Sequence, residues 1–369
     1  MYKKFFMGIA AMAALTLVSC SSEDLNSLSD NSSKNEAISF DGYLGRSAVA
    51  VNGSRGSVLT IDNLQTEGFG VFGNYNSTGG QNFGYNLFKN QKVTGTTSTG
   101  GTNKVTKWTY DGVKYWPSTG HIDFLAYAPY DADKALTGSK INFTVKSNVT
   151  EQKDLLWANA KKQTIQTIAT TNNKVKFHFA HALSRLGFTV KLKGKSSTDA
   201  TIMLTNITLA GSASVTESTP GAFYTGGDLD LAEGSWDQTT LTTKQNFVWF
   251  SNSHKVTSTS QSNKDFNTDY LFIIPQNFSQ TQTENTLYVI VEYTMQYTDV
   301  KDSDGNPVII KNTVSKQLTP DFAKGKAYTI NLTIGRPIEF DADVTEWSTT
   351  TDNKNNDINI DTWDVIEQK

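Results

Sequence analysis

The chain has 369 residues, a net charge of −3 and one cysteine, Cys20. The small net charge, without blocks of like charge, argues against a nucleic-acid partner, and a single cysteine excludes an internal disulfide framework. The length predicts two domains. The chain is rich in Thr, Ser, Asn and Gly and has few helical patterns. Together with Val, Ile, Phe and Tyr, this composition favours strands joined by polar turns.

The first residues predict a lipoprotein signal. A short basic start, MYKK, precedes an apolar run over residues 5–18, which is shorter than the about 20 residues of a membrane-spanning helix but suits a signal peptide. The run ends in Leu17-Val18-Ser19-Cys20 and resembles the bacterial lipobox. We therefore expect residues 1–19 to be a signal peptide and Cys20 to carry lipid of the outer membrane. The alternative is a leftover or buried cysteine beside an ordinary cleavage site.

The residues after Cys20 predict a tether. Residues 20–36 are polar and aperiodic, so we expect a flexible connection between the lipid and the folded part. The acidic residues Glu23 and Asp24 are similar to the signal that sends some lipoproteins to the outer face of the outer membrane. The predicted location is therefore the cell surface.

Alternation with period two predicts most of the fold. The stretch AISFDGYL places Ile38, Phe40 and Leu44 on one face, so it could fill a sheet edge and bury three apolar side chains. Four later stretches alternate in the same way, with inward sets Ile141, Phe143 and Val145; Phe188, Val190 and Leu192; Leu287, Val289, Val291, Tyr293 and Met295; and Tyr328, Ile330, Leu332 and Ile334. One-sided alternation is typical of antiparallel sheets that pack one face on a core.

The predicted fold class is all-β, with two sandwich domains in series. The polar stretch 167–177 suggests a boundary, which gives an N-terminal domain over 37–172 and a C-terminal domain over 173–369. Residues 94–104 are interpreted as a long hairpin tip, and residues 151–163 as a short helix.

Two motifs resemble metal sites but favour other interpretations. His178 and His181 form H-x-x-H, yet residues i and i+3 of a strand point to opposite faces. The stretch 302–307, DSDGNP, is similar to the start of a calcium loop, but Thr313 stands where a bidentate Glu is needed. We expect a hairpin turn there and no metal site.

The chain shows no signature of an enzyme. We find no G-x-S-x-G, phosphate loop or H-E-x-x-H, so we expect no catalytic residues and no cofactor, although a fold could still assemble paired carboxylates. Trp108 and Trp116 could form a stacking platform for a sugar, or they could pack in the core.

Several stretches together resemble the fimbrillins of gut and oral bacteria, the Mfa-like and FimA-like type V pilin lipoproteins of Bacteroidales-type bacteria. In chain order they are the lipobox cysteine, AISFDG, GFGVFGNY, WTYDGVKYWPSTGHIDFLAYAPY, DLLWA, FHFAHALSRLGFTVKL, GKAYTINLTI and FDADVTEW. The resemblance implies two transthyretin-like β-sandwich domains and a lipoprotein precursor. It also implies that an arginine-specific protease removes the first strand, and that a strand from another subunit fills the groove.

The resemblance assigns roles to particular residues. The removable first strand would lie within 37–51 and include Ile38, Phe40 and Leu44. The cleavage site would be Arg46 or Arg55, in a Gly/Ser-rich stretch suited to proteolysis. Arg55 is slightly favoured because SRG stands where related chains tend to have their arginine. The alternative is that both are ordinary surface arginines.

The C-terminal tail, residues 349–369, is the candidate donor strand. Its apolar residues are Ile358, Ile360, Trp363 and Val365. The alternation slips by one residue between Ile360 and Trp363, so a straight strand needs a bulge to place all four on one face. The tail could instead fold back onto its own C-terminal domain.

The predicted function is a structural fimbrial subunit that supports adhesion. Its expected partners are other fimbrillin subunits, the arginine-specific protease, outer-membrane lipid through Cys20, and surface glycans or proteins. The alternatives are a non-polymerising tip or anchor subunit, or a monomeric surface lipoprotein that binds glycans.

Overall fold

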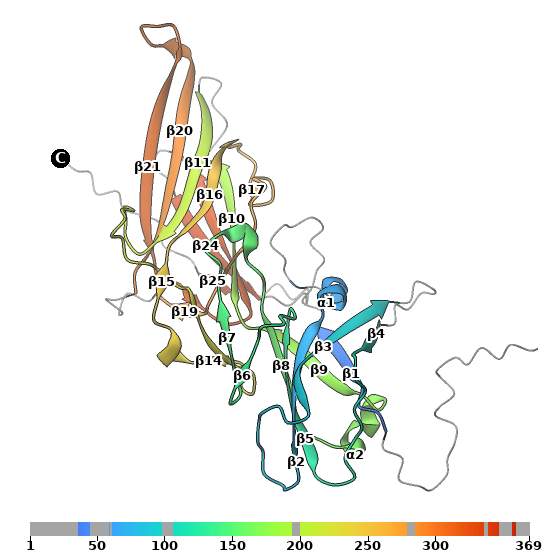
Figure 1. Ribbon diagram of the computed structural model, residues 1–369. Helices are drawn as coiled ribbons and strands as arrows, with labels where there is room; N and C mark the ends of the chain where they lie inside the picture. Colours follow the sequence, from blue (N-terminus) through green and yellow to red (C-terminus); the bar gives the residue numbers. More distant parts are fainter. Residues whose placement is uncertain are drawn as a thin grey trace, which may run out of the picture. The chain divides into compact units, whose positions relative to one another are not determined.

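The computed structural model describes residues 36–44, 59, 61–97, 106–193, 200–278, 285–335, 339–346 and 356–358 (Figure 1). Strands make up nearly all of the regular structure in this part of the chain, so the all-β prediction is confirmed. The helical elements described are short: α1 (Ile61–Glu67), α2 (Ile165–Ile168), and the 3-10 turns η2 (Val149–Glu151), η3 (Ala169–Thr171) and η4 (Gln238–Thr240).

The N-terminal sheet has the strand order β1-β9-β8-β5-β2-β3-β4, so β1 lies at its edge. Its strands are β1 (Phe40–Leu44), β2 (Phe69–Asn76), β3 (Phe88–Thr97), β4 (Thr106–Thr109), β5 (His121–Ala128), β8 (Leu156–Gln163) and β9 (Val175–His181). All neighbours pair antiparallel except β1 and β9, which run parallel.

The centre of this sheet is buried on both faces. Every residue of β5 is buried. Ile122 and Phe124 pack into one hydrophobic cluster, the first core, together with residues of β1 and β9. Leu125 and Tyr127 point to the other face and join a second hydrophobic cluster, the second core. A strand covered on both sides needs a near-continuous apolar sequence, and IDFLAYA supplies it.

Two sheets enclose most of the second core. One has the order β17-β10-β23-β24-β25 with β18 beside β10, and the other has the order β16-β11-β20-β21. Their strands are β10 (Ser184–Leu192), β11 (Ala200–Ala210), β16 (Phe247–Lys255), β17 (Gln261–Ser262), β18 (Leu271–Ile273), β20 (Leu287–Lys301), β21 (Pro307–Leu318), β23 (Lys326–Ile334), β24 (Glu339–Glu346) and β25 (Asn356–Ile358). The inward sets predicted for residues 188–192 and 328–334 are buried, as their alternation indicates.

Shorter strands complete the fold. β6 (Leu136–Thr137), β7 (Lys140–Thr144), β13 (Gly226–Asp230) and β14 (Ser235–Trp236) form the order β14-β13-β7-β6. β12 (Phe223–Tyr224) pairs with β15 (Lys244–Gln245), and β19 (Gln276–Asn277) with β22 (Asp321–Phe322). Thus β7 shares a sheet with β13 across the predicted domain boundary, and β9, just after that boundary, belongs to the N-terminal sheet. The division at residues 172 and 173 stays a prediction.

The predicted helix at 151–163 is wrong, because most of it is strand β8. Leu156, Ala158 and Ala160 are buried in alternation and β8 pairs with β5. Leu, Ala and Lys favour helices, but intrinsic propensity is a weak determinant, and pairing with a buried neighbour outweighs it.

Most strand pairs are antiparallel, as the one-sided alternation indicates, but β1 pairs parallel with β9 and β10 with β23. Parallel partners need long connections, and strands so far apart in sequence satisfy this requirement.

The predicted turn at 302–307 is confirmed: it joins β20 to β21, and the Asp302 carboxylate accepts the N–H groups of Asp304 and Asn306 at 2.9 and 2.8 Å. β3 and β4 pair antiparallel on either side of the predicted hairpin tip, but residues 94–97 belong to β3 and residues 98–104 lie outside the described residues.

Gly234 and Gly305 both have positive φ, but only Gly234 lacks space for a side chain, so substitutions at the two positions distinguish the cost of backbone strain from the cost of crowding. A Cβ on Gly234 (φ 64°) would lie 1.9 Å from Trp157 Cζ2, whereas Gly305 (φ 81°) has no heavy atom within 4 Å of that position. We expect Gly234→Ala to lower the free energy of unfolding by about 2–4 kcal/mol, and Gly305→Ala by about 1 kcal/mol. Urea unfolding measures both, and equal losses would show that Trp157 moves aside.

Candidate functional site

The candidate site is the first strand and the surface that it covers. Residues 36–44 run along the open edge of the N-terminal sheet, where Phe40 to Leu44 pair with Val175 to Phe179 of β9 (Figure 1). Just before β1, the Val175 N–H donates to the Ser39 carbonyl at 2.9 Å, and the Ser39 hydroxyl donates to the Asn173 carbonyl at 3.0 Å. One side of the segment is therefore bound to β9.

The other side of the segment is bound to the loop before β5. The Ile38 N–H donates to the Lys114 carbonyl at 2.7 Å, and the Trp116 N–H donates to the Glu36 carbonyl at 2.9 Å. Ala37 and Tyr115 form an isolated antiparallel bridge between these bonds. A nine-residue segment thus satisfies backbone groups on two separate parts of the chain.

The inward side chains of the segment are part of the first core. Ile38, Phe40 and Leu44 are buried, as the alternation of AISFDGYL predicts. The Phe40 ring lies 5.3–5.7 Å from four rings, those of Phe88, Tyr110, Phe124 and Phe177. Aromatic contacts at these distances add to the free energy of burial.

Tyr110 fixes the segment from within the site. Its hydroxyl donates to the Ile38 carbonyl at 2.7 Å and accepts the Lys114 N–H at 3.3 Å. Burial raises the pKa of Tyr110 above its usual value, and the Lys114 hydrogen bond offsets this only in part. The phenol therefore stays protonated and remains a donor at neutral pH.

The two histidines of β9 lie on opposite faces, as the strand prediction requires. His178 is exposed and its ring lies 5.6 Å from that of Tyr43. His181 is buried, and its Nδ1 lies 2.7 Å from Asp154 Oδ2. The same carboxylate oxygen accepts the Leu59 N–H at 3.2 Å. Within the described residues, no group of three or more His, Cys, Asp or Glu side chains could hold a metal ion.

Of the two alternatives for Trp108 and Trp116, packing in the core is confirmed and the sugar platform is not formed. Their exposed fractions are 7% and 2%, and both belong to the first core. Trp108 packs edge-on against Phe69 at 5.1 Å, and Trp116 against Phe124 at 6.3 Å. Neither indole face is open to a ligand.

Several predicted site residues lie outside the described residues: Cys20, Arg46, Arg55, Ile360, Trp363 and Val365. Ile358 ends β25, which pairs antiparallel with β24 through Ala342. Their roles stay predictions.

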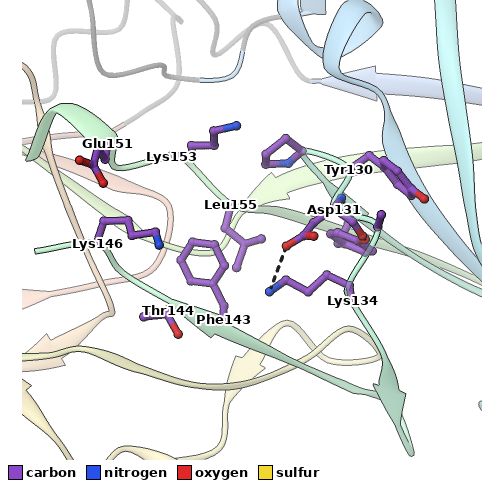
Figure 2. Close-up of a pocket in the computed structure, with 12 residues that line it drawn as sticks. Tyr130, Asp131, Lys134, Phe143, Thr144, Lys146, Glu151, Lys153 and Leu155 are labelled. Carbon is purple, nitrogen blue, oxygen red and sulfur yellow. Dashed lines mark hydrogen bonds and ion pairs between the residues drawn. The ribbon is translucent and has the colours of Figure 1, made fainter. Parts of the chain in front are cut away.

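A cavity of about 600 Å³ borders the second core, since Tyr127 and Leu155 of that core line it. Figure 2 shows the cavity. It is lined by Tyr127, Pro129, Tyr130, Asp131, Ala132, Lys134, Phe143, Thr144, Lys146, Glu151, Lys153 and Leu155. In Figure 2 the Phe143 ring lies between Lys146 and Lys134. The Lys134 Nζ is 5.8 Å from the centre of that ring and 3.5 Å from Asp131 Oδ2.

The cavity combines apolar surface with excess positive charge. Three lysines face two carboxylates, Asp131 and Glu151, and Glu151 also accepts a hydrogen bond from Asn148 Nδ2 at 3.0 Å. No sequence pattern predicts this cavity, because its lining residues come from separate segments with no shared motif. The alternation that marked Phe143 as inward was the one available signal.

No helix in the described residues is long and apolar enough to span a membrane. The sequence of residues 58–352 matches the model of the family described as Fimbrillin-like. The chain therefore belongs to the fimbrillin-like family, and the resemblance inferred from its motifs is confirmed. The match places the chain in a class of fimbrial proteins.

Solved structures from Bacteroides are similar to this chain to different degrees. A fimbrial protein from Bacteroides vulgatus is 21% identical with a TM-score of 0.60, and the match covers 85% of this chain and 100% of that chain. Candidate cell adhesion proteins from Bacteroides uniformis and Bacteroides ovatus are 18% and 13% identical, with TM-scores of 0.46 and 0.47. These matches cover 85% and 86% of this chain and 99% of each of those chains. No curated protein matches the sequence.

The burial of β1 predicts a large difference between its two faces. We expect Phe40→Ala to lower the free energy of unfolding of the uncut chain by about 3–5 kcal/mol, because it removes a ring packed against four others. Tyr43→Ala, on the exposed face of the same strand, should lower it by less than about 1 kcal/mol. Urea unfolding followed by near-ultraviolet circular dichroism measures both. A small loss for Phe40→Ala would mean that β1 is not an integral part of the first core.

Proposed function

We propose that this chain is a subunit of a cell-surface fimbrium that supports adhesion. It is exported as a lipoprotein precursor with lipid on Cys20, and an arginine-specific protease cuts it after Arg46 or Arg55. The first strand then leaves, and a strand of another subunit takes its place. Residues 37–172 and 173–369 act as the two domains of the subunit, at the outer membrane and then in the fibre.

The observation that carries this proposal is the placement of residues 36–44. They form an edge strand, they contribute three buried apolar side chains, and they precede both predicted cleavage sites in the chain. Each buried Ile, Leu or Phe contributes roughly 1.5–3 kcal/mol. Their loss would leave an apolar groove and unpaired backbone groups, which a strand from another chain can satisfy.

The part of the chain retained after cleavage is held to the fold near its new N-terminus by the buried residue Leu59. Leu59, four residues after Arg55, is buried, and its N–H donates to Asp154, which also contacts His181. Cleavage after either Arg46 or Arg55 therefore leaves the Leu59–Asp154 hydrogen bond in the mature subunit. The tail that contains Ile358, Ile360, Trp363 and Val365 is the candidate donor strand, but its residues Asn356–Ile358 pair with β24 of the same chain.

The test is limited digestion of the chain lacking residues 1–20 with an arginine-specific protease. We expect one early cut after Arg46 or Arg55, identified by mass spectrometry, and a ladder of multimers on an unboiled denaturing gel. The charge-preserving variants Arg46→Lys and Arg55→Lys identify the site, since only one should block the cut. A cut that yields only monomer would contradict strand exchange and favour a tip or anchor subunit.

A second candidate function, glycan binding, is favoured by the cavity beside Tyr127. Its volume suits one or two sugar rings. The Phe143 ring offers an apolar face for a sugar, and Lys146 offers a partner for a carboxylate. The other two lysines already lie near carboxylates, Lys134 at 3.5 Å from Asp131 and Lys153 at 4.0 Å from Glu67. The ligand class is therefore an acidic saccharide.

This candidate predicts charge-dependent binding. Lys146→Ala should weaken binding of a hexuronic or sialic acid oligosaccharide by about tenfold, whereas Lys146→Arg should retain it. Lys176→Ala on the exposed face of β9 is the control and should have no effect. Isothermal titration at two salt concentrations gives the affinities, and binding should weaken at higher salt. Equal affinities for Lys146→Ala and the unchanged protein would exclude this cavity.

A further inference from the structure

The inward face of residues 36–44 has one position without a side chain. Ile38, Phe40, Gly42 and Leu44 all face the first core, and Gly42 is buried like the others. Its φ is not positive, so the backbone does not require glycine here. Any requirement for glycine must come from the space around it.

That space is filled by Trp108 and Phe69. A Cβ built on Gly42 would lie 3.1 Å from Trp108 Cζ2 and 3.2 Å from Phe69 Cε1. These distances are shorter than ordinary van der Waals contact, so alanine would require its neighbours to shift by a few tenths of an ångström. A larger side chain would require a ring to leave its place.

Neither ring can move easily. Trp108 is buried, packs against Phe69, and is held by the pairing of β4 with β3. Phe69 is fully buried and also lies 5.7 and 5.2 Å from the rings of Phe177 and Phe179. Packed cores resist added volume, so this position acts as a fixed steric limit.

We propose that the groove under β1 selects a donor strand with glycine, or at most alanine, at the position of Gly42. The donor pattern is apolar-x-apolar-x-Gly-x-apolar, read in either chain direction. This inference rests on the proposed function, which supplies the exchange of strands. It identifies the partner by the shape of its strand.

The chain's own tail does not carry this pattern. Residues 349–369 contain neither glycine nor alanine. Placing Ile358 and Ile360 at the positions of Ile38 and Phe40 puts Thr362 at the position of Gly42 and Asp364 at that of Leu44. The proposal therefore makes the tail a poor occupant of this groove, whereas residues 36–44 carry the full pattern.

Peptide competition tests the inference. The full chain without its signal peptide is nicked by the arginine-specific protease, unfolded in urea, and refolded with an excess of a fluorescent peptide of residues 36–44. Gel filtration measures the fraction retained. Matched peptides carry Gly42→Val or Tyr43→Val, and a further peptide spans residues 356–366.

We expect the native and Tyr43→Val peptides to be retained alike, and the Gly42→Val and tail peptides to be retained at least about tenfold less. Retention of the Gly42→Val or tail peptide at the native level overturns the glycine requirement alone. Failure to retain the native peptide overturns strand exchange itself. In the uncut chain, Gly42→Val should lower the urea midpoint and Tyr43→Val should not, and equal midpoints also overturn the inference.

Discussion

The packing of Phe40 among four aromatic rings joins β1 to the first core, and the proposed strand exchange depends on the groove that this ring fills. The strand that carries it, β1, is the first of the described strands and lies at the edge of the sheet, where it pairs with β9 alone. Its departure therefore breaks one strand ladder, whereas the removal of an interior strand would break two. An interior strand could not be exchanged in this way. The site thus combines a large contribution to the core with a topology that permits its removal.

The rest of the sheet can keep its pairing without that strand. β9 still pairs with β8, and the pairs through β5, β2, β3 and β4 do not involve β1. The central strands are also covered on their second face by the second core. Removal of β1 therefore exposes one groove and one edge, and it leaves the ladder that defines the groove. A persistent groove is what an incoming strand requires.

The sequence predicted the parts of the fold that depend on local pattern. Period-two alternation identified the inward residues of β10, β20 and β23, and it identified Ile38, Phe40 and Leu44. The alternation pattern failed where contacts between distant residues decide the structure. β8 is a strand because it pairs with β5. The parallel direction of β1 depends on its partner β9, which lies more than 130 residues later in the chain. The cavity near Phe143 and the limit at Gly42 depend on residues from separate strands, so no local pattern could reveal them.

Glycine in the interior of a strand is unfavourable, because it contributes no side chain and loses more conformational freedom than other residues. Its presence in a strand that otherwise supplies apolar bulk therefore calls for a reason in its surroundings. Trp108 fills the volume that a side chain at position 42 would occupy. The apolar surface buried at position 42 is thus supplied by Trp108 of the retained chain and not by a side chain of the strand that leaves. A groove built in this way binds its occupant through the flanking apolar positions, and it rejects strands of the wrong shape through the position between them.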